Sequence, residues 1–217
     1  MSDFSNTELL QILACPLDQT PLENKGEYLR CRNGHQFALE GGIPVFSEHP
    51  RRELVPHNMK ACDRKRALPQ IDPFVDDWIV NTNGNLYWNV RGKLPRYPIP
   101  KWPWVAGQGK TLLDIGCGWG RWTMASALSG FRSIGLDVHL DALAAARRVT
   151  NQMGIATDYV CSEANHLPFL PSSIDVVYSY SVLLGKGYGE ASDPQDLPSA
   201  EARRALSVAI AQFRGPL

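Results

Sequence analysis

In the second half of the chain, short apolar runs alternate with stretches that can form helices. The runs occupy residues 111–113, 134–136, 157–161 and 174–178. One helix can begin after the first run and another near Asp141, whereas residues 162–169 connect the last two runs as a loop. The order strand, helix, strand, helix, strand, strand predicts an α/β fold built on a parallel sheet.

A glycine-rich segment follows the first apolar run. Residues 114–120 read Asp-Ile-Gly-Cys-Gly-Trp-Gly, and Gly116, Gly118 and Gly120 allow a tight turn whose N–H groups can approach a ligand closely. A dinucleotide fingerprint requires a further glycine at position 121, where this chain has Arg121, so NAD is the weaker interpretation. Asp114 favours a ligand that carries an ammonium group. A loop of this kind alone can also be just a tight connection.

Asp137 ends the second apolar run, about twenty residues beyond the first glycine of the loop. A carboxylate at the end of a neighbouring parallel strand can accept both hydroxyls of a ribose. The alternative is that Asp137 caps the helix that begins near Asp141. Cys117 and Cys161 are expected to be small buried apolar residues, because no activating base lies near them in the sequence.

Over residues 111–182 the chain resembles the class I S-adenosylmethionine-dependent methyltransferases. The resemblance is carried by residues 113–120, by Gly-Leu-Asp at 135–137, by Glu163-Ala164 before Leu-Pro-Phe at 167–169, and by residues 174–179. It implies that the glycine loop holds the methionine and ribose part of S-adenosylmethionine, that Asp137 takes the ribose hydroxyls and that Glu163, beside Ala164, contacts the adenine. The family usually has Asp at position 163. Glu163 alone could also be a solvated loop charge.

The amino-terminal residues predict a small separate module. Residues 5–13 can form a helix with Ser5 and Glu8 at capping-box spacing. Four potential zinc ligands follow: Cys15, Asp18, Cys31 and His35. The stretch resembles the zinc-ribbon-like domain that activates tRNA and protein methyltransferases, and the zinc module of ribosomal RNA guanine methyltransferases. Metal-binding members have cysteine at position 18, so the alternative is a metal-free module with both cysteines buried and His35 capping a turn.

These patterns divide the chain into an amino-terminal module (1–48), a connecting strap rich in proline and tryptophan (49–110), and a methyltransferase domain (111–217). Proline favours extended chain, so the strap is expected to run across the core. Tyr97 and Trp119 are candidates to cover the ligand, with plain core packing as the alternative. Because only 42 residues follow Asp175, the domain is expected to be incomplete after about residue 183, with a loop at 185–198 and a helix at 199–213.

The formal net charge of zero gives no overall field that would attract nucleic acid or an anionic membrane. No apolar run approaches the roughly 20 residues that span a bilayer, and we expect a cytoplasmic protein. The predicted function is methyl transfer to an unidentified acceptor, a small molecule before RNA. No residue is singled out as a catalytic base, and His139 and His166 are expected to be capping or surface residues. The alternatives are a non-catalytic protein that pairs with a partner at an exposed sheet edge, and a truncated, inactive fragment.

Overall fold

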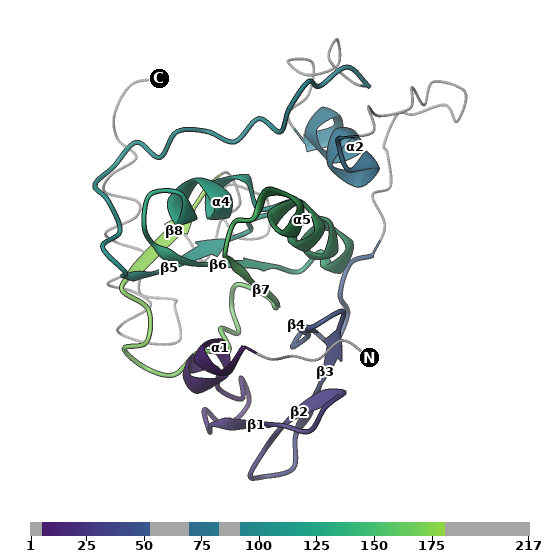
Figure 1. Ribbon diagram of the computed structural model, residues 1–217. Helices are drawn as coiled ribbons and strands as arrows, with labels where there is room; N and C mark the ends of the chain where they lie inside the picture. Colours follow the sequence, from purple (N-terminus) through teal and green to yellow (C-terminus); the bar gives the residue numbers. More distant parts are fainter. Residues whose placement is uncertain (1–5, 53–69, 83–91, 181–217) are drawn as a thin grey trace.

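The computed structural model of this protein describes residues 6–52, 70–82 and 92–180 (Figure 1). One of its two four-stranded sheets has the order β7-β6-β5-β8, and all the strands of this sheet are parallel. The elements of this part are β5 (Thr111–Ile115), α4 (Arg121–Ala127), β6 (Arg132–Asp137), α5 (Leu140–Met153), β7 (Asp158–Cys161) and β8 (Val176–Ser179). The predicted α/β fold with a parallel, Rossmann-like sheet is confirmed.

The register of the sheet brings the functional loops to one edge. Ile115 at the end of β5 pairs with Leu136 on β6 and with Ser179 on β8, and Asp137 pairs with Cys161 on β7. The carboxyl ends of β5, β6 and β8 therefore lie side by side, which is where open α/β sheets bind their ligands.

The amino-terminal module contains α1 (Thr7–Ile12) and a small antiparallel sheet in the order β1-β2-β3-β4. Its strands are β1 (Leu22–Asn24), β2 (Tyr28–Cys31), β3 (Gln36–Glu40) and β4 (Ile43–Pro44). The expectation of a Ser5 cap was wrong, because the N-cap is Asn6, whose side chain accepts a hydrogen bond from the Leu9 N–H at 2.9 Å. Asparagine caps a helix as well as serine does, and the helix begins two residues later than expected.

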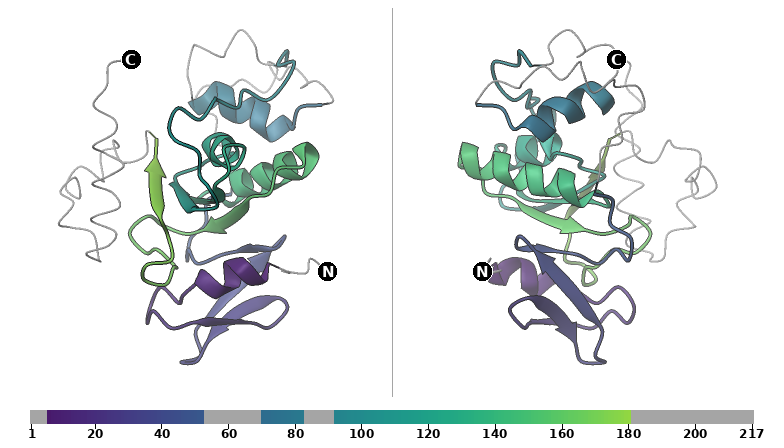
Figure 2. Two further views of the ribbon diagram at one scale, coloured as in Figure 1. Left: turned by 60° about the vertical axis from the view of Figure 1, so that its left-hand side comes forward. Right: turned by 90° about the vertical axis from the view of Figure 1, so that its right-hand side faces the viewer.

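This module covers one face of the parallel sheet. Leu9, Leu13 and Leu29 of the module share a core with Leu113 and Ile134 of the sheet. Figure 1 shows α1 and β1–β4 on one side of the sheet and α4 and α5 on the other, and Figure 2 shows the same layers from two further directions. Parallel sheets need both faces covered, and here the module takes a position that helices occupy in most α/β folds.

The loop between β7 and β8 joins the module to the sheet. Leu13 forms an antiparallel bridge with Phe169, and the Ala14 N–H donates to the carbonyl of Pro168 at 2.9 Å. Burying leucine side chains of this size stabilises a fold by about 1.5–3 kcal/mol each, so the module is part of the domain's core.

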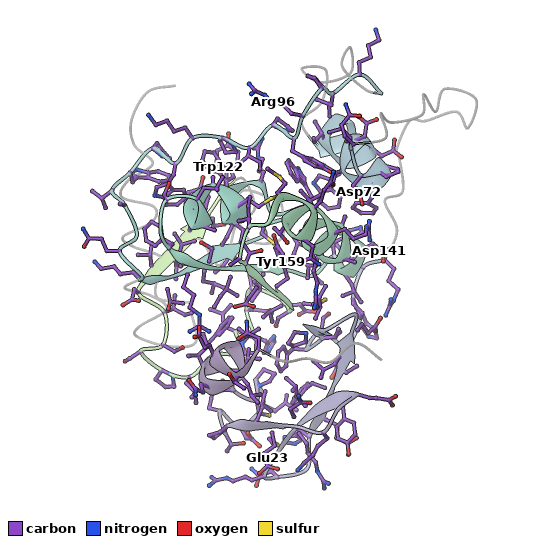
Figure 3. The ribbon with its side chains drawn as sticks, in the orientation of Figure 1. Glu23, Asp72, Arg96, Trp122, Asp141 and Tyr159 are labelled. Carbon is purple, nitrogen blue, oxygen red and sulfur yellow. The ribbon has the colours of Figure 1, made fainter. Side chains whose placement is uncertain are left out.

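The strap is not extended throughout, which corrects the sequence-based expectation. It contains the helix α2 (Pro73–Thr82), because Asp72 caps the first turn by accepting from the Phe74 N–H at 3.0 Å and because proline suits the first helical position. Val75 and Ile79 are buried against α5. Residues 95–106 contain no helix or strand and pack on the side of the sheet that carries α4 and α5 (Figure 3).

The loop predicted at 185–198 and the helix predicted at 199–213 lie outside the described residues. Among the residues that the structure describes, β8 pairs with β5 alone. In that same part of the chain, no helix combines the length and the apolar character needed to cross a bilayer.

Candidate functional site

The glycine loop after β5 has a shape that only glycine adopts easily. Gly116, Gly118 and Gly120 have φ values of 72°, 55° and 79°. The Gly116 N–H donates to the carbonyl of Leu136 at 2.7 Å, which holds the loop against the end of β6. A Cβ on Gly120 would lie 2.6 Å from the hydroxyl oxygen of Tyr159. The positive φ angles explain why glycine is present at all three positions, and the close approach of Tyr159 on β7 is a further reason at Gly120.

Asp137 connects the loop to the end of β6. Its Oδ2 accepts from the Gly118 N–H and its Oδ1 from the His139 N–H, both at 2.8 Å. Burial raises the pKa of this carboxyl, and the two backbone donors counteract the rise. A carboxylate oxygen has two lone pairs, so each oxygen can still accept a hydrogen bond from a ligand hydroxyl.

Asp114 is the second acid of the site and is only 2% exposed. Burial raises its pKa to about 7, against the hydrogen bond that the Thr123 hydroxyl donates to Oδ2 at 2.7 Å. The negative charge of Asp137 raises it further. At neutral pH a substantial share of Asp114 is thus protonated, and a nearby cation such as an ammonium group would favour its charged form.

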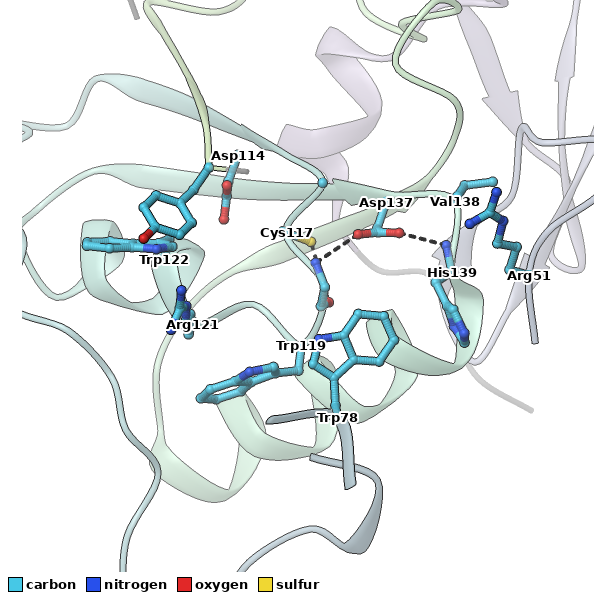
Figure 4. Close-up of a pocket in the computed structure, with 13 residues that line it drawn as sticks. Arg51, Trp78, Asp114, Cys117, Trp119, Arg121, Trp122, Asp137, Val138 and His139 are labelled. Atoms are coloured by element: carbon cyan, nitrogen blue, oxygen red, sulfur yellow. Dashed lines mark hydrogen bonds between the residues drawn. The ribbon is translucent and has the colours of Figure 1, made fainter. Parts of the chain in front are cut away.

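These residues line a pocket of about 390 Å³ at the carboxyl ends of β5 and β6 (Figure 4). Of the predicted site residues, the structure places Asp114, Gly116, Gly118 and Asp137 in its wall. Gly120 does not line the pocket. It is the N-cap of α4 and lies close to the Tyr159 side chain. The volume falls in the range of about 300–1,000 Å³ that is typical of small-molecule sites.

The structure does not bring Glu163 and Ala164 into this pocket. Glu163 accepts a hydrogen bond from the Ser47 hydroxyl at 3.5 Å and lies 3.9 Å from His166, while Ala164 packs against the core shared with the amino-terminal module. The connection after β7 is bonded to the module at Pro168 and Leu170, whereas the Ser162 N–H donates to the carbonyl of Asp137 at 3.1 Å.

The two aromatic candidates differ. Trp119 lines the pocket, whereas Tyr97 does not. The Tyr97 hydroxyl accepts from the Asp72 N–H at 2.8 Å and donates to Gln152 Oε1 at 2.9 Å, so Tyr97 fastens the strap to α5. For Tyr97, core packing is the correct alternative.

Several lining residues were missed by the sequence analysis. They are Arg51, Trp78, Arg121, Trp122, Val138 and Tyr180, whereas His139, which also lines the pocket, was expected to be a capping or surface residue. Arg121 and Trp122 follow the glycine loop directly, so their position in the sequence could have indicated them. Trp78 comes from α2, packs within 3.2 Å of where a Gly118 Cβ would lie, and meets the His139 ring edge-on with centroids 5.0 Å apart. No local pattern predicts such tertiary contacts.

His139 is the N-cap of α5, and its Nδ1 accepts from the Ala142 N–H at 3.4 Å. The expectation of a capping histidine is confirmed. Cys117 and Cys161 are buried, and burial raises the pKa of both thiols, so neither is a ready nucleophile.

The four predicted metal ligands of the module converge. The ligand atoms of Cys15, Asp18, Cys31 and His35 all lie within 4.8 Å of one another. Nδ1 of His35 is 3.1 Å from Asp18 Oδ2, 3.4 Å from the Cys15 sulfur and 3.3 Å from the Cys31 sulfur. The edges of a tetrahedral zinc site with sulfur, nitrogen and oxygen ligands are about 3.2–3.8 Å, so the arrangement fits zinc.

Asp18 is oriented by its neighbours. Thr20 donates to Oδ1 through both its hydroxyl, at 2.6 Å, and its N–H, at 3.0 Å, and Asn33 donates to Oδ2 at 2.8 Å. The hydrogen bond from the Thr20 hydroxyl is the main reason that the pKa of Asp18 lies well below its usual range. Burial raises the pKa of the Cys15 thiol to about 11. Asp18 is therefore charged at neutral pH and can bind a metal directly, and a bound metal would favour the thiolate form of Cys15.

Comparison with known proteins agrees with this geometry. Residues 112–206 match a family model described as a methyltransferase domain. The carboxy-terminal part of the chain is therefore a methyltransferase domain of the class I S-adenosylmethionine-dependent type. The chain is 29% identical over 119 residues to the ubiquinone biosynthesis O-methyltransferase of Aeromonas salmonicida (strain A449), and the aligned stretch covers 54% of this chain and 41% of that protein. It spans less than half the length of three curated relatives that it matches.

Among solved structures, the chain matches a putative S-adenosyl-L-methionine-dependent methyltransferase (mmp1179) from Methanococcus maripaludis. The two chains are 19% identical, with a TM-score of 0.36, over 51% of this chain and 57% of the other.

The amino-terminal module has relatives of its own. Residues 13–41, which include all four ligands, match a zinc-ribbon model described as the amino-terminal part of RlmA. A UPF0434 protein from Stutzerimonas stutzeri (strain A1501) is 44% identical over 52 residues, which are 23% of this chain and 85% of that protein. Over that stretch the chain is a member of the UPF0434 family. The predicted resemblance of the module to a zinc ribbon is confirmed.

Proposed function

We propose that this protein binds S-adenosylmethionine in the pocket beside β5 and β6 and transfers its methyl group to an acceptor. The observation that carries the proposal is the hydrogen bond from Gly118 to Asp137, which fixes the glycine loop next to a carboxylate that can still accept hydroxyl hydrogens. Asp114 adds a site for an ammonium group at the other end of the same pocket.

The residues divide the work of binding. Asp137 would accept the ribose hydroxyls, the loop at Gly116–Gly118 would approach the ligand closely, and Asp114 would receive the ammonium. When bound, S-adenosylmethionine would supply a methyl group that is open to in-line attack by the acceptor. The bond between this methyl group and sulfur breaks as the new bond forms, and the rest of the cofactor leaves as a neutral thioether. The protein's contribution is to hold the two reactants in line and to exclude water, which can account for a large part of the rate.

Binding tests the assignment of this pocket. Trp78, Trp119 and Trp122 line it, so a titration with S-adenosylmethionine should change the tryptophan fluorescence. Asp137→Ala and Gly118→Val should each weaken binding at least tenfold, whereas Asp141→Ala, an acid on α5 outside the pocket, is the matched control and should not. Unchanged affinity in the first two variants would show that the ligand binds elsewhere.

For the acceptor, we propose a small molecule, with RNA as the second candidate. The zero net charge supports this choice, since proteins that bind RNA through its backbone carry an excess of positive charge. Formation of S-adenosylhomocysteine can be followed after adding a low-molecular-weight metabolite fraction or a total RNA fraction. Turnover that needs only the RNA fraction, and disappears after ribonuclease treatment, would reverse the choice.

We propose further that Cys15, Asp18, Cys31 and His35 hold a zinc ion. The support is the approach of four suitable ligand atoms and the fixed orientation of Asp18 by Thr20. Elemental analysis of purified protein should find about one zinc per chain, and Cys31→Ser should lose it. Metal content near zero in the folded protein would favour the metal-free alternative.

The cellular location that we propose is the cytoplasm. The four described cysteines are free thiols, which fits a reducing compartment. Cell fractionation with an antibody against the chain would test this, and recovery from an oxidising compartment would contradict it.

A further inference from the structure

The segment that leaves the amino-terminal module, residues 45–51, is bonded to the parallel sheet through its main chain. Val45 forms a parallel bridge with Cys161 at the end of β7, and the Phe46 N–H donates to the carbonyl of Cys161 at 2.7 Å. The segment therefore begins beside the carboxyl end of the sheet, which is also the edge where the pocket lies.

Arg51 binds the turn that follows β6 through two main-chain hydrogen bonds. Its N–H donates to the carbonyl of Val138 at 2.9 Å, and its carbonyl accepts from the Leu140 N–H at 2.8 Å. A parallel bridge thus pairs Arg51 with His139, and Figure 4 shows Arg51 next to Val138 and His139 at the pocket. The main chain of Arg51 therefore holds residues 138–140 in place.

The same turn supplies a donor that orients Asp137. The His139 N–H donates to Oδ1 of this carboxyl at 2.8 Å, while the Gly118 N–H donates to Oδ2. Because a hydrogen bond weakens steeply when it is misaligned, the orientation of the carboxylate depends on the position of this turn. The main chain of Arg51 is thus linked to Asp137 through His139.

We propose that Arg51 is a positioning residue for the cofactor, because its main chain holds the turn at 138–140 and so keeps the Asp137 carboxylate oriented toward the ribose hydroxyls. This inference rests on the proposed function, and it adds to the site a segment that precedes the methyltransferase domain in the sequence. A misplacement of about 1 Å can remove most of the effect of a binding or catalytic group. The two main-chain bonds of Arg51 therefore matter for binding.

The alternative is that Arg51 acts through its side chain, which also lines the pocket. Arg51 is an exposed residue, and an exposed charge contributes little binding energy because water screens it. The two main-chain bonds do not depend on this charge, and for this reason we favour the main-chain role.

Substitution by proline separates the two roles, because proline has no N–H to donate to Val138 and fits an extended segment. The readout is the ratio of the affinities for S-adenosylhomocysteine and for its 2′,3′-dideoxy analogue, which lacks the ribose hydroxyls. The wild-type chain should prefer S-adenosylhomocysteine by about tenfold to hundredfold, as expected for hydrogen bonds to a carboxylate. Arg51→Pro should remove most of this preference by weakening the binding of S-adenosylhomocysteine, and should leave the affinity for the analogue nearly unchanged.

Two control variants keep the N–H of Arg51 in place. Arg51→Gln changes only the side chain and should keep the wild-type ratio. Arg52→Pro is the matched control for the substitution itself, because within the described residues the Arg52 N–H donates no backbone hydrogen bond, and it should keep the ratio as well.

A second pair of variants removes the other bond. Leu140 is the first residue of α5, a position that suits proline, so Leu140→Pro deletes the N–H that donates to Arg51 and keeps the helix. Leu140→Ala shortens the same buried side chain and keeps the N–H. Only Leu140→Pro should lower the ratio, and this pair decides the question if Arg51→Pro does not unfold cooperatively.

If a folded proline variant, Arg51→Pro or Leu140→Pro, keeps the wild-type ratio, or if Arg51→Gln lowers it as much as Arg51→Pro does, the main-chain role is wrong although the proposed function stands. Equal affinity of the wild-type chain for the two compounds would refute the role of Asp137 in ribose binding, and this inference with it. If the folded wild-type chain binds neither compound, the proposed function fails as well.

Discussion

Replacing Asp114 by asparagine should stabilise this protein at pH 8 and weaken its binding of S-adenosylmethionine. Asp114 is almost fully buried, and burial raises its pKa from 3.8 to about 7. Above pH 7 the folded protein therefore carries a buried negative charge. Asparagine removes the charge, has nearly the same shape and can still accept the hydrogen bond from the Thr123 hydroxyl.

The size of the effect follows from the pKa. Each pH unit between the unfolded and folded pKa is worth about 1.36 kcal/mol. The raised pKa of Asp114 therefore costs about 4 kcal/mol at pH 8, and roughly 2 kcal/mol at pH 5, where the carboxyl has to take up a proton on folding. Because the folded-state pKa of Asp114 is raised, the folded protein binds the proton more tightly, and the free energy of unfolding from this group falls as the pH rises from about 4 to 7. Asp114→Asn should remove this part of the pH dependence.

Urea unfolding at pH 5 and at pH 8 measures the change in stability caused by Asp114→Asn and its pH dependence. Calorimetric titration measures the affinity for S-adenosylmethionine. Asp158→Asn is the matched control, because burial also raises the pKa of Asp158, on β7, but this residue does not line the pocket. Asp158→Asn should leave the affinity for S-adenosylmethionine unchanged. The reasoning is refuted if Asp114→Asn destabilises the folded protein at pH 8, or if it binds the ligand as tightly as the wild type.

Three further predictions concern the loop, the module and the strap. Gly120→Ala should lower the free energy of unfolding in urea by about 2–4 kcal/mol, because its Cβ would lie 2.6 Å from the Tyr159 hydroxyl. Gly154→Ala, at a similar φ but with open space around it, should lower it by about 1 kcal/mol. Equal losses would contradict the close approach. A zinc chelator should lower the melting temperature of the wild type and not of Cys31→Ser, and a chelator without effect on the wild type would argue against a bound metal. Tyr97→Phe should lose about 1–2 kcal/mol of stability with unchanged ligand affinity, because the Tyr97 hydroxyl bonds the strap and α5 but does not line the pocket; a large loss of affinity would return Tyr97 to the site.

The parts of the fold that the sequence could predict are those that depend on local patterns. The apolar runs and the glycine spacing around residues 111–137 predict strands β5 and β6 and the loop between them, because these features reflect backbone sterics and strand burial. The convergence of the two acids on one pocket follows from the parallel register alone.

The parts that the sequence could not predict depend on contacts between distant segments. The proline-rich strap that contains Pro73 was expected to be extended. With Asp72 before it, however, Pro73 is the first residue of α2, and this helix places Trp78 in the wall of the pocket. The amino-terminal module read as a separate unit, but Leu13 and its neighbours close one face of the sheet. Glu163 is bonded to Ser47 near that module and does not line the pocket, a contact that its position in the sequence does not predict.

The most direct test of the account is isothermal titration of the full 217-residue chain with S-adenosylmethionine and with S-adenosylhomocysteine. The account predicts one site per chain with micromolar affinity for both compounds, and the loss of that binding in Asp137→Ala. The absence of binding to either compound, in a protein that still unfolds cooperatively, would contradict it.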